Sequence, residues 1–174
     1  MTDPRFFGYG SLVNLRTHDY PHTTHANITG WRRIWRSTTH QPFAILSVIP
    51  DAGTRLDGIT AAVPNSDWGQ LDEREFAYRR QTLGCGTAIY EVTDKIITPQ
   101  TGPYPILRSY LDVVIQGYLR EFGAEGAARF FATTDNWGPI LDDRNAPLYP
   151  RHQMITTDET AFVDAQLAAL ARAD

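Results

Sequence analysis

The chain has 174 residues, of which 42% are hydrophobic and 21% charged, and its formal net charge is -4 at pH 7. This length and composition predict one globular domain over residues 1–174 and exclude a disordered chain. The negative charge and the arginines dispersed among acids argue against nucleic acid or an anionic membrane as a partner. Cys85 is the only cysteine, and the sequence has neither a leader nor a membrane-length apolar run. A cytoplasmic protein is therefore expected.

The N-terminal half has the pattern of strands separated by turns. Turn formers at Pro50, Asp51, Gly53 and Asp57-Gly58 predict breaks between three apolar segments. The expected elements are a strand at 5–9, a helical turn at 11–16, a loop at 19–27, and strands at 28–38, 43–49 and 59–63.

The C-terminal half combines helices with one further strand. Ser66 is a suitable N-cap for a helix over residues 67–80, and Gly123 separates two helical patterns. The expected elements are that helix, a strand at 82–92, helices at 106–122 and 124–131, a turn-rich segment at 133–153 and a last helix at 158–171. Strands and helices in this order predict an α+β fold with one core.

A glycine-rich turn comes after the first predicted strand. Residues 8–12 are Gly-Tyr-Gly-Ser-Leu, so Tyr9 lies between two glycines and Ser11 comes directly after them. Glycine allows a ligand to come close to the backbone, and N–H groups together with a serine hydroxyl can bind a carboxylate. An ordinary turn that contains two glycines is the alternative interpretation.

One acidic residue lies on the apolar side of the predicted helix at 67–80. Projection at about 100° per residue places Glu75 together with Trp68, Leu71 and Tyr78. Such neighbours desolvate a carboxylate and raise its pKa from about 4.3 towards the range that a general base or acid needs. The alternative is a structural ion pair between Glu75 and Arg79 or Arg36.

Taken together, the turn and the acidic helix resemble the γ-glutamylcyclotransferase family. Members begin with a Tyr-Gly-Ser turn and carry a Leu-Asp-x-x-Glu helix, which residues 9–11 and 71–75 match. Ser109-Tyr110, with Gly117 farther along the same helix, is similar to the helix whose tyrosine reaches the substrate pocket in relatives. Some relatives have Asn after Tyr-Gly-Ser. Leu12 at this position resembles the glutathione-degrading branch, whereas the rest of the chain does not resemble that branch.

The resemblance implies a small mixed β-barrel flanked by helices, and an enzyme that releases 5-oxoproline and an amine from a small γ-glutamyl substrate. The α-amine of the substrate attacks its own γ-carbonyl, so the reaction needs no protein nucleophile, metal or cofactor. The implied general acid/base is Glu75. The implied substrate-binding residues are Tyr9, Gly10, Ser11, Leu12 and Tyr110.

Several alternatives remain open from the sequence. The same fold could serve as a non-catalytic binding or interaction module, and the leaving group could be an amino acid, a dipeptide or another amine. His22 and His25 lie in a predicted loop without a third ligand, which favours a solvated loop over a metal site. Cys85 lies between two glycines in a predicted strand, so a small buried residue is expected there.

Overall fold

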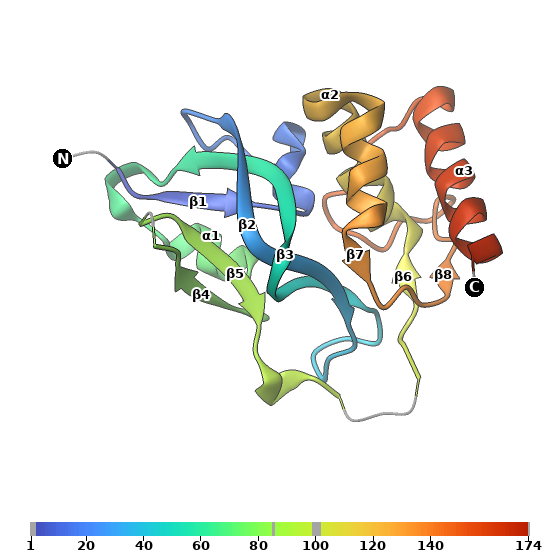
Figure 1. The fold of residues 1–174 in the computed structure, drawn as a ribbon, viewed down its shortest axis with the longest axis horizontal. Helices are drawn as coiled ribbons and strands as arrows, with labels where there is room; N and C mark the ends of the chain where they lie inside the picture. Colours follow the sequence, from blue (N-terminus) through green and yellow to red (C-terminus); the bar gives the residue numbers. More distant parts are fainter. Residues whose placement is uncertain (1–2, 85, 99–101, 174) are drawn as a thin grey trace.

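The computed structural model describes residues 3–84, 86–98 and 102–173 and forms an α+β fold (Figure 1). Cys85 lies outside the described residues. The strands are β1 (Arg5–Gly8), β2 (Thr24–Arg36), β3 (Ile45–Ala62), β4 (Tyr78–Thr82), β5 (Ala88–Val92), β6 (Ile106–Leu107), β7 (Thr134–Asp135) and β8 (Ile140–Leu141). The α-helices are α1 (Gly69–Arg74), α2 (Arg108–Ala132) and α3 (Thr157–Ala173), and the 3-10 helices are η1 (Ser11–Val13), η2 (Leu15–Thr17), η3 (Pro64–Ser66) and η4 (Asp94–Ile96).

The main sheet has six strands in the order β4-β5-β1-β3-β2-β7, and β6 and β8 form a second, two-stranded sheet. The pairs β1–β5 and β2–β7 are parallel, whereas the other neighbours in the main sheet are antiparallel. In Figure 1, α2 and α3 lie side by side at one end of this sheet.

The sheet is open, so the expected barrel is wrong. The two edge strands, β4 and β7, each pair with one neighbour and not with each other. β7 has only two residues, and β4 carries the exposed residues Arg79 and Arg80. A short strand and charged side chains are features that keep a sheet edge from pairing further. The mixed α+β class, in contrast, agrees with the structure.

Most of the predicted strands at 43–49 and 59–63 lies in one long strand, β3, whose pairing with β2 is interrupted at residues 52–54, close to the expected breaks at Pro50, Asp51 and Gly53. β3 pairs with β2 over residues 45–51 and 55–60, and β2 begins at Thr24 within the predicted loop at 19–27. A β-bulge between Thr29 and Gly30 adjusts the register, and Gly30 adopts a φ of 94° that favours glycine. Cross-strand pairing on both sides therefore keeps β3 one strand, while Ala52, Gly53 and Thr54 stay outside the ladder at the predicted break.

The predicted helix at 67–80 is also wrong in extent. α1 ends at Arg74, and Tyr78 begins β4, which pairs antiparallel with β5. Every residue of β5 is buried, so its backbone groups need partners on a neighbouring strand, which β4 supplies. The predicted strand at 82–92 is accordingly the second half of a hairpin whose turn is closed by the Leu83 N–H to the Thr87 carbonyl at 2.8 Å.

The helix predictions in the last third hold well. α2 covers the second predicted helix and residues 108–122 of the first, whose residues 106–107 form β6 instead, and Gly123 has non-helical angles (φ 67°, ψ -174°) at the expected break. α3 extends the predicted last helix by one or two residues at each end. None of the described helices is both long and apolar enough to cross a membrane.

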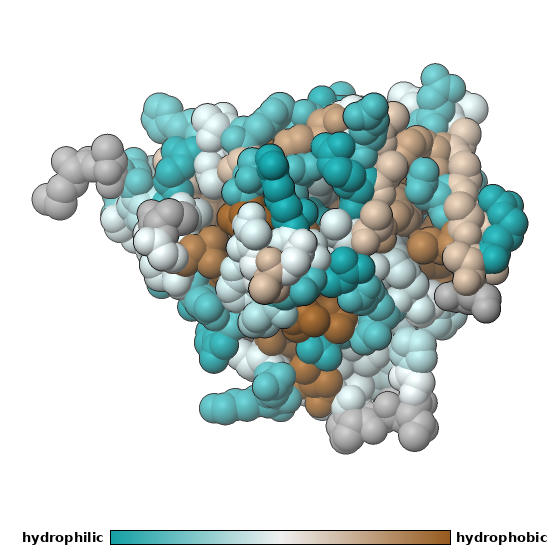
Figure 2. Space-filling view, in the orientation of Figure 1, coloured by the Kyte–Doolittle hydropathy of each residue, from teal (hydrophilic) through white to brown (hydrophobic). Residues whose placement is uncertain are grey.

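The hydrophobic core lies between the main sheet and α2. On the face seen in Figure 2, hydrophobic residues form small patches among hydrophilic ones. The core includes Phe6, Phe7, Leu46, Leu56, Ile59, Leu71, Ile89, Leu111, Val114, Ile115, Tyr118 and Phe130. The first strand, which leads into the glycine turn, thus begins inside the core and carries the turn to its edge.

Candidate active site

The glycine turn, Glu75 and Tyr110 meet at one depression in the surface. Its outer pocket, with a volume of about 280 Å³, is lined by residues of five segments: Ser11, 41–45, 74–78, Leu107 with Tyr110, and 148–151. A smaller inner cavity of about 30 Å³ is lined by residues 7–12, Leu46, Glu75, Tyr78, Tyr90 and Tyr110. Ser11, Glu75, Tyr78 and Tyr110 line both. All six residues expected at the site therefore line the same inner cavity.

The turn begins where β1 ends and depends on its two glycines. A Cβ at Gly8 would lie 2.7 Å from the Leu12 Cβ, and one at Gly10 would lie 3.0 Å from the Tyr110 hydroxyl. Only glycine at these positions lets η1 fold back on β1 while α2 brings Tyr110 against the backbone. The interpretation of this segment as a close-approach turn is thereby supported by its packing.

A buried arginine fixes the position of the turn. Arg33 is 1% exposed, and its Nε donates a hydrogen bond of 2.9 Å to the Tyr9 carbonyl. The Tyr118 hydroxyl donates to the same carbonyl at 3.0 Å and is itself bonded to Arg33. The Tyr9 hydroxyl donates to the Tyr90 carbonyl at 2.6 Å. Tyr9 therefore anchors the turn through both its backbone carbonyl and its side-chain hydroxyl, and the side chain is directed into the sheet.

Helix α2 holds the other side of the turn. The buried Asn14 side chain donates to the Val113 carbonyl at 2.9 Å and to Gln116 Oε1 at 3.0 Å. A Cβ at Gly117 would lie only 2.7 Å from the Asn14 nitrogen. Gly117 thus allows α2 to approach the segment after the turn, and this contact sets Tyr110, on the same helix, against Ser11.

Glu75 caps the C-terminus of α1 and points into the cavity. Its N–H donates to the Leu71 carbonyl at 2.9 Å, and its side chain is 14% exposed. Burial raises the pKa of Glu75 above its ordinary value, while the positive charges of Arg74 and Arg151 act in the opposite direction. The carboxylate is thus a partly desolvated group whose proton affinity is increased, as a general acid/base requires.

The ion pair of Glu75 differs from the one weighed in the sequence. Arg74 Nε lies 3.4 Å from Glu75 Oε1, whereas Arg79 pairs with Glu91. The Arg74 side chain is 7% exposed and also donates to the Thr17 carbonyl at 2.8 Å and to Ser11 Oγ at 3.2 Å. Arg74 therefore connects the carboxylate to the turn, and since Ser11 Oγ accepts from Arg74, its own proton is left to donate elsewhere.

Two tyrosines add hydroxyl groups to the cavity. Burial raises the pKa of Tyr110 and of Tyr78 above the ordinary tyrosine value, so both hydroxyls stay protonated at neutral pH. The Tyr78 hydroxyl donates to the Leu46 carbonyl at 2.7 Å. The Tyr110 hydroxyl lies against the backbone of Ser11 and Gly10. Tyr110 is therefore the hydroxyl beside both the turn and the carboxylate.

The turn-rich tail forms part of the outer pocket. Asp143 accepts hydrogen bonds from the Ser109 N–H at 2.8 Å, the Ser109 hydroxyl at 2.5 Å and the Leu148 N–H at 2.9 Å. Burial raises the pKa of Asp143, but these hydrogen bonds outweigh burial and lower it below the ordinary value. The Tyr149 ring packs edge-on against Tyr110, with centroids 5.0 Å apart. Asp143 thus holds the tail against the start of α2.

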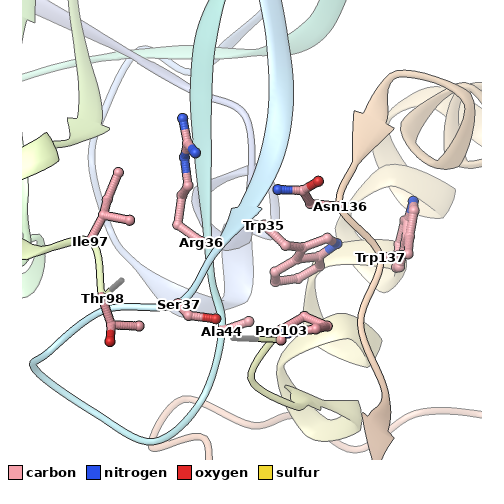
Figure 3. A pocket seen from close by; sticks show the side chains of 10 residues that line it. Trp35, Arg36, Ser37, Ala44, Ile97, Thr98, Pro103, Asn136 and Trp137 are labelled. Atoms are coloured by element: carbon pink, nitrogen blue, oxygen red, sulfur yellow. The ribbon is translucent and has the colours of Figure 1, made fainter. Parts of the chain in front are cut away.

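A second pocket of about 290 Å³ has a different chemistry (Figure 3). Its walls include Trp35, whose ring centroid lies 5.6 Å from that of Trp137, together with Arg36 and Asn136. No Asp or Glu is among its described lining residues. It therefore lacks a carboxylate that could act as a base, unlike the depression that holds Glu75.

Sequence reasoning did not assign Arg33, Arg74, Tyr149 or Arg151 to the site. Arg74 directly precedes Glu75, so its place in the acidic motif was a usable signal. The other three lie far from the motifs in sequence, and only the fold brings them to the turn and the pocket. The two histidines of the predicted loop lie apart from this depression, and His25 pairs with Glu121 at 2.9 Å.

The fold places the chain in a structural class with γ-glutamyl cyclotransferases. A solved structure described as γ-glutamyl cyclotransferase matches with a TM-score of 0.53 and 14% identity over 94% of this chain and 99% of that one. YkqA from Bacillus subtilis matches with a TM-score of 0.62 and 14% identity over 80% of this chain and 56% of that one. The human protein loc79017 matches with a TM-score of 0.55 and 15% identity over 82% and 96%.

The chain belongs to the ChaC-like protein family, a family of γ-glutamylcyclotransferases, whose model matches residues 5–125. That match contains the turn, Glu75 and Tyr110 and ends before the tail residues of the outer pocket. Sequence comparison with curated proteins gave no match. Family and fold together support an activity of the γ-glutamylcyclotransferase type.

Proposed function

We propose that this protein is a γ-glutamyl cyclotransferase that converts a γ-glutamyl amide into 5-oxoproline and a free amine, with Glu75 as the general acid/base. The observation that carries the proposal is the position of Glu75. A partly desolvated carboxylate and the 9–12 turn line one inner cavity, and the pKa of the carboxyl group is raised by its burial. The family supports the same type of activity.

In the proposed reaction, the Glu75 carboxylate takes a proton from the α-ammonium group of the substrate. An α-ammonium has an ordinary pKa of about 8, so a raised pKa of Glu75 narrows the gap that this transfer must cross. The freed amine then attacks the γ-carbonyl carbon and forms the C–N bond of a five-membered ring. Because both reacting groups belong to one molecule, the protein only has to hold the folded conformation.

The tetrahedral intermediate collapses by breaking the bond between the γ-carbon and the leaving nitrogen. Glu75 returns its proton to that nitrogen, and the second proton of the attacking nitrogen takes the same route. The attacking nitrogen thus loses two protons, the leaving nitrogen gains two, and Glu75 ends as a carboxylate. The amine departs as an ammonium ion, and the reaction uses no electrons from outside.

The turn and Tyr110 have the binding role in this proposal. Backbone N–H groups of residues 10–12 and the Ser11 hydroxyl are assigned to the α-carboxylate or the developing oxyanion, and the protonated Tyr110 hydroxyl adds a donor. Arg74 supports this arrangement because it bonds Ser11 Oγ and pairs with Glu75. Tyr9 and Leu12 shape the turn, since both side chains are buried.

The test is release of 5-oxoproline from a panel of γ-glutamyl compounds by the purified protein and two variants. Glu75→Gln is expected to fold and to abolish turnover, because the amide cannot accept the ammonium proton. Ser11→Ala is expected to lower turnover less, since the backbone donors of the turn survive. Activity of Glu75→Gln within a few-fold of wild type would remove Glu75 as the base. A panel without any turnover would favour a binding module of the same fold.

A further inference from the structure

The rim of the outer pocket carries apolar side chains that the protein leaves in solvent. Phe76 is 66% exposed and Leu148 is 52% exposed, and both line this pocket. They are two of the five large hydrophobic side chains that are exposed among the described residues. An exposed phenyl ring beside a pocket gains hydrophobic free energy when a ligand covers it, so grouped exposure of this kind indicates an apolar contact.

Each of the two residues contacts a neighbouring segment. Phe76 directly follows Glu75, and its ring packs edge-on against His40 with centroids 5.6 Å apart. Leu148 belongs to the tail segment, and its N–H is bonded to Asp143 at 2.9 Å. Phe43, partly buried, lines the same pocket. The rim is therefore an exposed apolar surface that includes the residue directly after Glu75.

The same pocket carries a guanidinium group that has no side-chain partner among the residues that the structure describes. Arg151 lines the pocket, is exposed, and forms neither an ion pair nor a side-chain hydrogen bond with them. Arg74 differs, because Thr17, Ser11 and Glu75 occupy it. Arg151 still acts on Glu75 electrostatically, although the two are too far apart for an ion pair. A positive charge with unused donors thus lies near the reacting atoms.

The apolar rim and Arg151 lie on the side of the site that is available to the leaving group of the substrate. The inner cavity holds only about 30 Å³, so the γ-glutamyl group is assigned to the turn at the inner end of the outer pocket, where Ser11, Glu75 and Tyr110 line both cavities. The leaving half of the substrate then lies in the outer part of that pocket, between the apolar rim and Arg151. An amine that contacts the apolar rim and also pairs with Arg151 carries a bulky apolar side chain and a carboxylate. An α-amino acid such as phenylalanine or leucine has both on the carbon next to the leaving nitrogen.

We propose that the preferred substrates are γ-glutamyl amino acids whose leaving residue has a bulky apolar side chain, bound by Phe76 with Leu148, and a free carboxylate, bound by Arg151. This inference rests on the proposed function of the same site. A leaving glycine leaves the rim exposed, and a simple amine leaves Arg151 without a partner. The carboxylate of a leaving dipeptide lies one residue farther from the scissile bond.

The first test compares kcat/KM for 5-oxoproline release from four compounds: γ-glutamylphenylalanine, γ-glutamylglycine, glutathione and γ-glutamylphenethylamine. γ-Glutamylphenylalanine is expected to exceed γ-glutamylglycine by roughly ten- to a hundredfold, because the phenyl group is buried on the rim. γ-Glutamylphenethylamine retains the phenyl group but lacks the carboxylate, and is expected to be at least tenfold worse. Equal values for the phenylalanine and glycine compounds, or glutathione as the best substrate, would overturn the proposal.

Variants assign each preference to its residue. Phe76→Ala is expected to reduce turnover of the phenylalanine compound at least fivefold and to leave that of the glycine compound within twofold. Arg151→Gln also removes a charge that lowers the pKa of Glu75, so kcat/KM is compared at the pH optimum of each enzyme. At that pH, kcat/KM for the phenylalanine compound is expected to fall close to that for the phenethylamine compound. Leu141→Ala and Arg55→Gln are the matched controls, since both residues are exposed and neither lines the pocket. A uniform loss on all substrates in Phe76→Ala or Arg151→Gln would contradict a role in selectivity.

Binding separates this proposal from the proposed function. Calorimetry on the Glu75→Gln variant measures the affinity for γ-glutamylphenylalanine and γ-glutamylglycine without turnover. If wild type releases no 5-oxoproline but binding of the phenylalanine compound is stronger and depends on Phe76 and Arg151, the catalytic assignment fails and the selectivity stands. If the two compounds are turned over but bind with equal affinity and turn over equally well, only the selectivity fails.

Discussion

Substitution of Gly117 by alanine tests the contact that holds helix α2 against the glycine turn. The added Cβ would lie 2.7 Å from the Asn14 nitrogen and 2.8 Å from its Cα, whereas ordinary contacts begin at 3.4 Å. Both atoms are backbone, so no side-chain rotation relieves the overlap, and α2 or the turn has to move. Overpacking of this kind costs about 1–3 kcal/mol of unfolding free energy.

The loss is measurable by calorimetry and by turnover. For a domain of this size, a cost of that magnitude lowers Tm by roughly 2–12 °C. Because α2 carries Tyr110, displacement of the helix also separates Tyr110 from Ser11, and a shift of about 1 Å at a reacting centre can reduce the rate about a hundredfold. We therefore expect kcat/KM for 5-oxoproline release to fall at temperatures where the variant is still folded.

Two further variants control this experiment. Gly53→Ala adds a Cβ that meets nothing within 4 Å, so its effect on stability is expected to stay within about 0.5 kcal/mol. Asn14→Gly combined with Gly117→Ala is expected to give no rescue, because the backbone of residue 14 remains. A Tm for Gly117→Ala within about 1 °C of wild type, with unchanged kcat/KM, would refute the close approach of α2 to the turn.

The charged groups of the site support three more predictions. Because burial raises the folded-state pKa of Glu75, the contribution of this group to stability is complete below its ordinary pKa of about 4.3 and is lost as pH rises through the raised value. Glu75→Gln should therefore be more stable than wild type at pH 8 but not at pH 4. Urea unfolding at both pH values measures this difference. Arg74→Gln removes a charge that lowers the pKa of Glu75, so the acidic limb of the profile of kcat/KM against pH should move to higher pH. Arg74→Lys keeps the charge and should move the limb less. If the limb moves in neither variant, Arg74 does not influence the titration of Glu75. Asp143→Asn should lower the free energy of unfolding by about 1–3 kcal/mol at pH 7 and raise KM, because the hydrogen bonds that fix the tail are weakened. Since the folded-state pKa of Asp143 is lowered, the stability difference from wild type should shrink as pH falls below about 3.9. A stability difference that stays constant with pH would exclude the carboxylate as its cause.

Glu75 points in the predicted direction, although the predicted helix that carries it is wrong in extent. α1 ends at Arg74, well before the predicted end at residue 80, and Tyr78 lies in a strand. Leu71 and Glu75 nevertheless remain in helical register, because the Glu75 N–H bonds to the Leu71 carbonyl at 2.9 Å. A four-residue spacing sets two side chains on one face through local geometry alone. The sequence therefore predicted the inward direction of Glu75, although not the strand β4 that begins three residues later.

Other parts of the site depend on contacts between distant segments. β3 continues past its predicted turns because β2 pairs with it on both sides of the unpaired residues 52–54, and the sheet stays open because β4 and β7 do not pair with each other. Arg33 reaches the Tyr9 carbonyl across 24 residues, which no local pattern indicates. Such contacts exchange chain entropy for burial and hydrogen bonds, and that balance is settled by the whole fold.

The sequence by itself determined the residues that meet at the depression: the turn at 9–12, Glu75 and Tyr110. Their character is local, since it rests on glycine angles, helical spacing and an apolar helix face. The tertiary structure alone decided which charges surround them. It placed Arg74 between the carboxylate and the turn, and it brought Arg151 and the apolar rim to the outer pocket through a tail that Asp143 anchors. The strength of an electrostatic interaction depends on burial and on the distance between the charges in the folded chain, and the spacing of residues in the sequence gives neither.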